Sequence, residues 1–458
     1  MVFSSILFLF KFLPITLLIY YIVPKKLKNL VLLVASLFFY SWGEPKYFPL
    51  MLACILVNYV AALLIDKHRE KRTFIGWMIG LAVFFDLGCL VFFKYSDFFI
   101  SNINSLLGTA IPLLKLTLPL GISFYTFQTM AYTIDVYRGK VKAERNIINL
   151  AAFVVLFPQL IAGPIVLYDD VAAALRDHRI TKQHLLDGIR LFIFGLGKKV
   201  LIANNVGALW TQVNELGFQN ISTPLAWLGI IAFSLQIYFD FSGYSLMAIG
   251  LGKLMGFDFP TNFNFPYISR SFTEFWRRWH ITLGSWFREY LYIPLGGNRK
   301  GYARTVINLL ITWAATGFWH GANWNFLLWG LLFFVLLSVE KRWLLKYLDK
   351  GKVWPHIYTL FILVLSWALF DITDMTNLGL FFTRLFDFTG GSDWIYYLRN
   401  YAASIVVAII FCIPVVEKAY NKVKNNLIID LLVLSVILFL SISYLVDSTY
   451  NPFLYFRF

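Results

Sequence analysis

The sequence has little charge and almost no cysteine. Charged residues make up 14% of the chain and hydrophobic residues 59%. In soluble domains, charged residues make up about 25% and hydrophobic residues about 45–50%. The three cysteines (Cys54, Cys89 and Cys412) lie in apolar runs without CxxC or metal-ligand spacing, so we interpret them as buried thiols. This composition excludes an ordinary soluble domain and indicates an integral membrane protein.

Several other features are missing. The chain has no internal repeat, which argues against transporters built from duplicated halves. No small-residue cleavage site follows the apolar segment 2–23, so we expect a retained first span rather than a signal peptide. No polar segment is long enough to fold alone. We therefore expect a single membrane domain over residues 1–458, with its motifs in a core at about 110–345 and generic spans at 354–446.

Long apolar runs dominate what is present. Runs of roughly 17–25 residues cross a bilayer as α-helices. The expected spans are 3–23, 29–42, 47–65, 75–93, 111–134, 147–168, 186–209, 224–252, 303–318, 322–340, 354–371, 400–416 and 426–446. Because several of these are short or broken, the pattern predicts an all-α polytopic membrane protein with about eleven to thirteen transmembrane or half-membrane helices.

Basic residues exceed acidic residues, 40 against 25. They gather in short connections at 24–28, 66–72, 138–145, 270–304, 341–352 and 418–424. Because basic loops stay on the cytoplasmic side of a membrane, we interpret the excess as a topology signal and expect no nucleic acid partner. A role of the longest cluster in binding an anionic donor stays open. Further basic residues at 169–185 break the alternation of sides, which predicts a half-membrane element between 147 and 200.

Residues 253–304 interrupt the apolar pattern most sharply. Ser271, with Glu274 three residues later, is typical of the start of a capped helix. The aromatic residues that follow share one helical face. The pattern predicts an amphipathic or re-entrant helix near 271–290, lying in the membrane interface or dipping into the membrane.

Two histidines directly follow tryptophan in aromatic-rich runs. His280 ends FTEFWRRWH, and His320 lies in WHGA after Trp319. An ionisable side chain at membrane depth is costly and by default marks function, and a neutral imidazole is the form that a general base needs. The structural alternatives are a packing hydrogen bond for His320 and an interfacial position for His280. No third histidine or cysteine stands at ligand spacing, so we expect no metal.

Two more polar residues accompany the histidines. Asp240 is a carboxylate in an apolar span, so it must pair, protonate or face water. Its candidate partners are Arg277, Arg278 or either histidine, and we favour a structural ion pair. Asn323 follows shortly after the second histidine.

Eight short segments carry a resemblance to a known family. The less specific ones are MVFSS (1–5), LPLGISFY (118–125), FPQLIAGP (157–164) and YFDFSGYS (238–245). The most specific ones are NFPYIS (264–269), FTEFWRRWH (272–280), YIPLGGNRKG (292–301) and WHGA (319–322). Together they resemble the membrane-bound O-acyltransferase family, in its bacterial alginate O-acetylase-like branch.

The resemblance implies many helices around a central funnel and a cytosolic thioester donor, acetyl-CoA, rather than a bound cofactor. It implies that His320 is catalytic and that His280 supports it. His320 would take the proton of an acceptor hydroxyl or attack the thioester itself. The supporting residues, at the oxyanion or the substrate, are expected to be Asn323, Asp240 and Trp319. Weaker candidates for contact with the anionic donor are Arg277, Arg278, Arg299 and Lys300.

In this branch, acetyl groups cross the membrane to an envelope polysaccharide, often with a separate periplasmic or extracellular acetyltransferase protein. The resemblance thus implies a multi-pass protein of the bacterial plasma (inner) membrane, in contact with lipid. The final acceptor is expected to be alginate, another exopolysaccharide or peptidoglycan. D-alanyl transfer to teichoic acid from a carrier-protein thioester is the alternative within the family. A polysaccharide or lipid transporter is the alternative from another class.

The side of the membrane that holds 270–304 is open to direct measurement. We predict that a cysteine placed at Asn298 reacts with membrane-permeant thiol reagents and not with reagents confined to the periplasm, because the basic turn belongs to the cytoplasmic side. The unsubstituted chain is the control for the three native thiols. Labelling of this cysteine by the reagent confined to the periplasm would contradict the cytoplasmic assignment.

Overall fold

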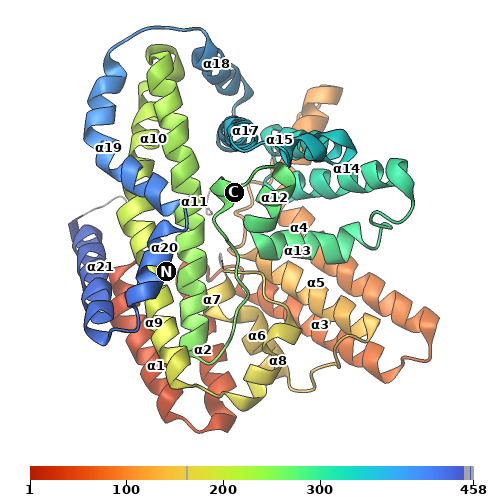
Figure 1. Cartoon of the computed structure of the whole chain (residues 1–458). Coiled ribbons are helices and arrows are strands. Elements are labelled where there is room, and N and C mark those ends of the chain that lie inside the picture. The colour runs from red at the N-terminus through yellow and green to blue at the C-terminus, as the bar shows by residue number, and fades with distance from the viewer. Residues whose placement is uncertain (161–162, 448–453, 455–458) are drawn as a thin grey trace. The chain divides into compact units, whose positions relative to one another are not determined.

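A computed structural model describes residues 1–160, 163–447 and 454. These residues form helices and no strand (Figure 1), which confirms the predicted all-α polytopic class. They divide into two compact units, Met1–Phe192 with Met247–Pro260 and Ile193–Leu246 with Thr261–Phe458. Residues 161–162 of the expected span 147–168 and of the motif FPQLIAGP lie outside the described residues.

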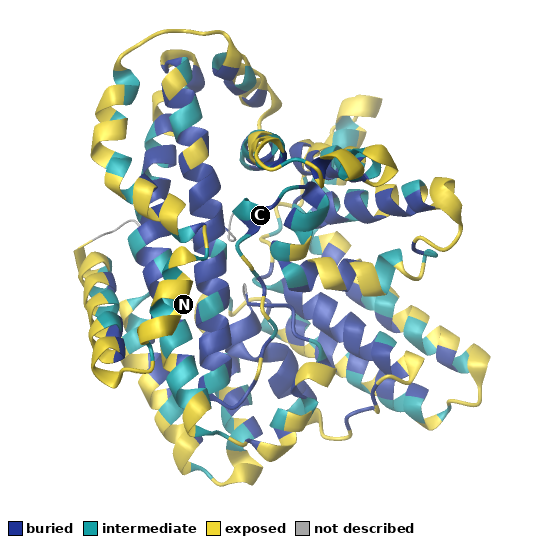
Figure 2. Ribbon diagram, viewed as in Figure 1, coloured by how far each residue is buried: buried dark blue, intermediate teal, exposed yellow. Residues whose placement is uncertain are grey.

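Seven helices of the described chain are long and apolar enough to cross a membrane. They are Phe48–Lys67, Arg72–Leu107, Thr223–Leu254, Trp324–Leu348, Trp354–Asp371, Asp393–Phe411 and Leu427–Asp447. They differ greatly in burial: most of Thr223–Leu254 is packed inside the protein, whereas Leu427–Asp447 is mostly exposed (Figure 2). An exposed apolar helix of this kind suits direct contact with lipid.

The first unit holds the N-terminal helices. After a π-helical segment at Phe8–Phe12, these are α1 (Leu13–Ile22), α2 (Lys25–Gly43), α3 (Phe48–Lys67), α4 (Arg72–Leu107), α5 (Ile122–Arg138), α6 (Ile147–Val155), α7 (Phe157–Leu160), α8 (Tyr168–Asp177) and the first part of α9 (Lys182–Gly197). α6, with nine residues, is only about 14 Å long. The elements described between 147 and 160 and between 163 and 177 are therefore each too short to cross a bilayer.

A buried polar network joins three helices of this unit. Asp86 of α4 is fully buried and accepts hydrogen bonds from Asn58 of α3 at 3.0 and 2.9 Å and from Thr129 of α5 at 3.0 Å. Thr133 donates to the Asn58 side-chain oxygen at 2.6 Å. Interhelical hydrogen bonds of this kind hold helices together where no water is present.

The second unit holds the rest of the chain. Its helices are α10 (Asn204–Leu216), most of α11 (Thr223–Leu254), α12 (Phe272–Arg278), α13 (Ile281–Phe287), α14 (Gly301–His320), α15 (Trp324–Val339), α16 (Leu345–Leu348), α17 (Trp354–Asp371), α18 (Met375–Phe386), α19 (Asp393–Phe411), α20 (Val415–Val423) and α21 (Leu427–Asp447). π-helical segments occur at Lys198–Ala203, Arg288–Tyr292 and Glu340–Leu344.

Two expectations from the sequence need correction, and one helix was not expected. A continuous helix near 271–290 is wrong, because the chain breaks after Arg278 and resumes at Ile281. The span expected at 111–134 is wrong in its first part: 108–119 is irregular and contains two prolines, which lack the backbone N–H of a helix interior. α18 was not expected, because its 12 residues are too few to cross a bilayer and polar side chains interrupt its apolar run.

Helices α14 and α15 lie side by side (Figure 1) and meet through two glycines. A Cβ atom on Gly317 would lie 2.4 Å from the carbonyl oxygen of Phe326, and one on Gly330 would lie 2.4 Å from that of Trp313. This close approach is one that only small residues permit. It fixes α14, which ends at His320, against α15.

We predict that Gly317→Ala destabilises the protein by about 1–3 kcal/mol, because the added methyl group overpacks a backbone contact. The measurement is thermal unfolding of the detergent-solubilised protein. Gly88→Ala in α4 is the matched control, since a Cβ there meets nothing within 4 Å. Equal unfolding temperatures for the two variants would show that the α14–α15 contact is not tight.

Candidate functional site

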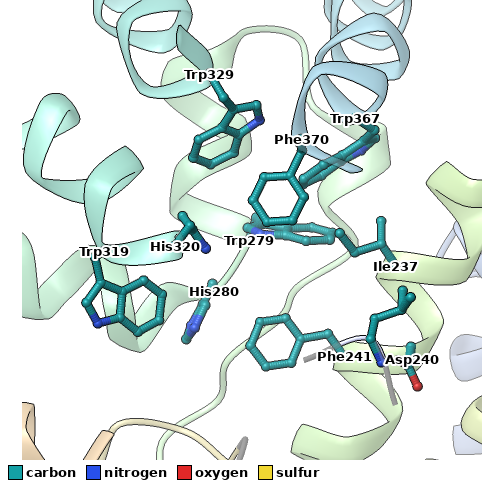
Figure 3. A pocket seen from close by; sticks show the side chains of 11 residues that line it. Ile237, Asp240, Phe241, Trp279, His280, Trp319, His320, Trp329, Trp367 and Phe370 are labelled. Carbon is teal, nitrogen blue, oxygen red and sulfur yellow. Dashed lines mark hydrogen bonds between the residues drawn. The ribbon is translucent and has the colours of Figure 1, made fainter. Parts of the chain in front are cut away.

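A small cavity in the second unit brings the two histidines together (Figure 3). It is lined by Ile237, Asp240, Phe241, Trp279, His280, Trp319, His320, Trp329, Trp367, Phe370 and Leu454. Its volume is about 40 Å³, room for only a few waters by the rule of roughly 10–15 Å³ for each. The walls are mainly aromatic, so any polar group placed inside is poorly solvated and interacts strongly with the few polar atoms present.

His280 reaches the cavity because the chain breaks between α12 and α13. It has a left-handed backbone, with φ 44° and ψ 53°, a conformation that costs a non-glycine residue energy and often marks a functional position. Backbone hydrogen bonds hold the break on both sides: Asn264 N–H donates to Arg278 O and Ile281 N–H to Asn262 O, both at 2.9 Å.

The start of α12 is fixed by two capping residues. The Ser271 hydroxyl accepts from the Glu274 N–H at 3.0 Å, which confirms the cap expected from the sequence. Glu340, fully buried, accepts from the N–H groups of Phe272 at 2.7 Å and Thr273 at 2.8 Å. Both caps satisfy donors that the end of a helix leaves unpaired. Glu340 therefore helps to position the segment that leads to the first histidine.

The His280 ring is buried, and its two nitrogens have different surroundings. Its Nδ1 lies 3.1 Å from the side-chain oxygen of Asn262, and its buried Nε2 has no hydrogen-bond partner among the described residues. Phe241 packs edge-on against the ring at 4.7 Å between centroids. Burial lowers the pKa of His280 to about 3, because the apolar surroundings disfavour the charged form. The imidazole is therefore neutral at physiological pH.

His320 is the last residue of α14 and is half-buried. Its ring lies 5.1 Å from the rings of both Trp329 and Phe370, nearly perpendicular to each. Trp319 lies beside both histidines, 4.9 Å from the His320 ring and 6.5 Å from the His280 ring (Figure 3). This edge-to-face packing holds the aromatic walls around the pair.

Asp240 lines the cavity, but its carboxylate forms a buried ion pair with Lys199. The Lys199 Nζ and Asp240 Oδ1 atoms are 2.6 Å apart, and both side chains are at most 3% exposed. The other carboxylate oxygen accepts from the Leu454 N–H at 2.9 Å. The predicted type of interaction is present, whereas the candidate partners, two arginines and two histidines, were wrong. Figure 3 shows the carboxylate pointing away from the histidines.

Asn323, expected near the oxyanion, is exposed and caps no backbone group of α15. It is not among the residues that line the cavity. The buried asparagine of this region is Asn325, which donates to the carbonyl oxygens of Leu369 at 3.2 Å and Phe370 at 2.9 Å. Asn325 thus holds the end of α17, which supplies one wall of the cavity.

The four cations proposed for donor contact do not line the cavity. Arg278 pairs with Glu274 at 2.9 Å and donates to the Asn264 carbonyl at 3.1 Å. Arg277, Arg299 and Lys300 are exposed. Arg277 and Arg278 end α12, and Arg299 and Lys300 lie in the turn before α14, so a role in attracting a donor stays a prediction.

Sequence reasoning missed four residues that support the site: Lys199, Asn262, Asn325 and Glu340. Two of them, Lys199 and Glu340, carried a signal, since a charge inside an apolar run needs a partner. Asn262 and Asn325 carried none, because their partners are set by the tertiary fold. The described residues contain no cluster of three or more His, Cys, Asp or Glu side chains that could hold a metal ion.

Comparison with known proteins gives one family. Residues 141–347, which include both histidines, match the sequence profile of MBOAT, the membrane-bound O-acyltransferase family. The probable alginate O-acetylase of Pseudomonas putida is 41% identical over 402 residues, covering 86% of this chain and 81% of the relative. The peptidoglycan O-acetyltransferase of Helicobacter pylori is 39% identical over 378 residues, covering 75% and 71%. The teichoic acid D-alanyltransferase of Streptococcus thermophilus is 28% identical over 250 residues, covering 50% and 58%.

We predict that Lys199→Met destabilises the protein by about 3–5 kcal/mol, because it leaves the Asp240 carboxylate buried without its cation. Combining it with Asp240→Asn removes that charge and is expected to restore most of the loss. Both are measured by thermal unfolding in detergent. Equal losses for the single and the double variant would show that the ion pair does not account for the effect.

Proposed function

Because the chain belongs to the membrane-bound O-acyltransferase family, we propose that it takes acetyl groups from a cytosolic thioester, acetyl-CoA, for the O-acetylation of a cell-envelope polysaccharide. Relatives about 40% identical over most of the chain are named for acetyl transfer to alginate and to peptidoglycan. The final acceptor is accordingly alginate, another exopolysaccharide or peptidoglycan. A bacterial inner membrane is the compartment in which a cytosolic donor and an envelope acceptor face the same protein.

The observation that carries this proposal is the convergence of His280 and His320 on one cavity (Figure 3). They come from different segments, the α12–α13 break and the end of α14. Burying two ionisable side chains in an aromatic cavity lowers the stability of the fold, because each polar ring must be desolvated. Acyl transfer gives both a use: one proton must leave a hydroxyl, and the acceptor must be held during the attack.

The proposed reaction is attack of an acceptor hydroxyl on the thioester carbonyl. The hydroxyl oxygen forms a bond to the carbonyl carbon, the carbon–sulfur bond breaks, and the hydroxyl proton passes through an imidazole to the departing thiolate. His320 is our assignment for the base. A covalent route, in which its nitrogen first takes the acetyl group, uses the same residue and differs in the order of steps.

The small size of the cavity favours a short acyl group. A volume of about 40 Å³ leaves little room beyond the reacting atoms, and the surrounding indole and phenyl rings are closely packed against one another. An acetyl group adds only one methyl to the carbonyl. Acetyl transfer is also the reaction named in the more similar relatives, whereas D-alanyl transfer is named in relatives that match only about half of this chain.

A separate periplasmic or extracellular acetyltransferase protein is the proposed partner for the last step. The cavity is too small to hold a sugar polymer together with a donor. A second protein would resolve this by carrying the acetyl group to the polymer, so that only a hydroxyl-bearing group need enter the cavity.

We predict that His320→Ala abolishes polysaccharide-bound acetate in the source cells at unchanged levels of membrane protein. Loss of a general base typically slows a reaction by about 10²–10⁴-fold. The readout is acetate released by mild alkali from purified envelope polysaccharide, with D-alanine measured in the same sample.

The matched control is His68→Ala, which changes a histidine in the first unit at the end of α3. It is expected to keep bound acetate at the level of the unsubstituted chain. Unchanged acetate in His320→Ala would contradict the catalytic assignment, and loss of D-alanine instead of acetate would identify a different acyl group.

A further inference from the structure

The side-chain oxygen of Asn262 receives three hydrogen-bond donors. They are His280 Nδ1 at 3.1 Å, the Thr282 N–H at 3.2 Å and the Thr282 hydroxyl at 2.9 Å. Asn262 is only 1% exposed, and its backbone carbonyl also accepts from the Ile281 N–H. A single buried residue therefore organises the first turn of α13 and one edge of the His280 ring.

The backbone N–H of Thr282 fixes the orientation of the Asn262 amide. A backbone N–H can only donate, so the atom that faces it must be the oxygen and not the NH₂ group. That oxygen in turn can only accept. The nitrogen of His280 that faces it must therefore carry the proton, which places the N–H on Nδ1.

The opposite edge of the ring follows from this assignment. A neutral imidazole carries one proton, so Nε2 is left with a lone pair. His280 is neutral, because burial among aromatic rings disfavours the cation. Phe241 packs against the ring at 87°, and Phe263 lies nearly parallel to it at 6.3 Å. These contacts leave the ring little freedom to turn over.

We propose that Asn262 is a positioning residue that holds His280 in the Nδ1–H tautomer, so that Nε2 accepts a hydrogen bond from a hydroxyl group of the acceptor. The proposal rests on the proposed acyl transfer. In this tautomer, Nε2 of the neutral His280 has no proton to donate to an oxyanion. A hydroxyl has one hydrogen to donate, so the hydroxyl that donates to His280 differs from the one that attacks under the influence of His320.

The direct test is nitrogen NMR of the full chain, labelled with ¹⁵N-histidine and held in detergent. Nitrogen shifts distinguish Nδ1–H from Nε2–H, and the His280 signal is identified by its loss in His280→Gln. We expect Nδ1–H in the unsubstituted chain. In Asn262→Leu, which removes the acceptor, we expect the Nε2–H form to appear. In Asn262→Asp, which retains an oxygen for the same three donors, we expect Nδ1–H to remain.

Acetyl transfer is measured on the same variants, as acetate bound to envelope polysaccharide per unit of membrane protein. We expect Asn262→Leu to lower it by roughly tenfold or more, the effect of losing one buried hydrogen bond at a reacting group. Asn262→Asp should retain most of it. The matched control is Asn264→Leu, the same change at an exposed position of the same segment, which should change neither the tautomer nor the transfer.

The outcomes separate this proposal from the function on which it rests. An Nε2–H signal in the unsubstituted chain, or an unchanged tautomer in Asn262→Leu, overturns the positioning role whatever the activity. A tautomer change without loss of transfer overturns its part in the reaction. If the tautomers behave as expected while even the unsubstituted chain adds no acetate, the positioning stands and the proposed acetyl transfer fails.

Discussion

Where a helix breaks among apolar side chains, the backbone N–H and C=O groups that lose their helical partners need other hydrogen bonds. The region around the histidines depends on this constraint. The chain breaks between α12 and α13 at His280, which takes a left-handed backbone. Glu340 accepts the N–H groups that begin α12, and Asn262 accepts those that begin α13. Because both partners are buried, the break is held in one conformation, and the first histidine is fixed with it.

The second histidine is positioned by the packing of the helices around it. α14 approaches α15 through Gly317 and Gly330 at backbone distance, and this contact fixes the end of α14. Asn325, at the start of α15, fixes the end of α17 by donating to two of its carbonyl oxygens. Three helices therefore meet around His320 with little freedom to shift. In such a rigid aromatic cavity, the polar atoms that remain act on a substrate without first having to reorganise.

The sequence predicted the elements that depend on local signals and missed those that depend on the fold. The long apolar runs predicted most helices, and the unusual setting of His280 and His320 singled them out before any contact was known. Helical periodicity predicted one helix through His280. No local pattern reveals that Asn262 accepts hydrogen bonds from the N–H groups at the start of a second helix. Lys199 is set too far from Asp240 in the chain for spacing to pair them. Sequence patterns thus do not reveal which residue a single buried polar side chain contacts in the fold.

The central claim is that the two histidines act together in one step. A double-mutant cycle tests it most directly, with single-turnover acetyl transfer measured for His280→Ala, His320→Ala and the double variant. Residues that act as a unit are strongly non-additive, so we expect the double variant to transfer acetyl groups about as slowly as the slower single variant. If the two rate losses instead multiply, the histidines act independently, and the account of a shared site is wrong.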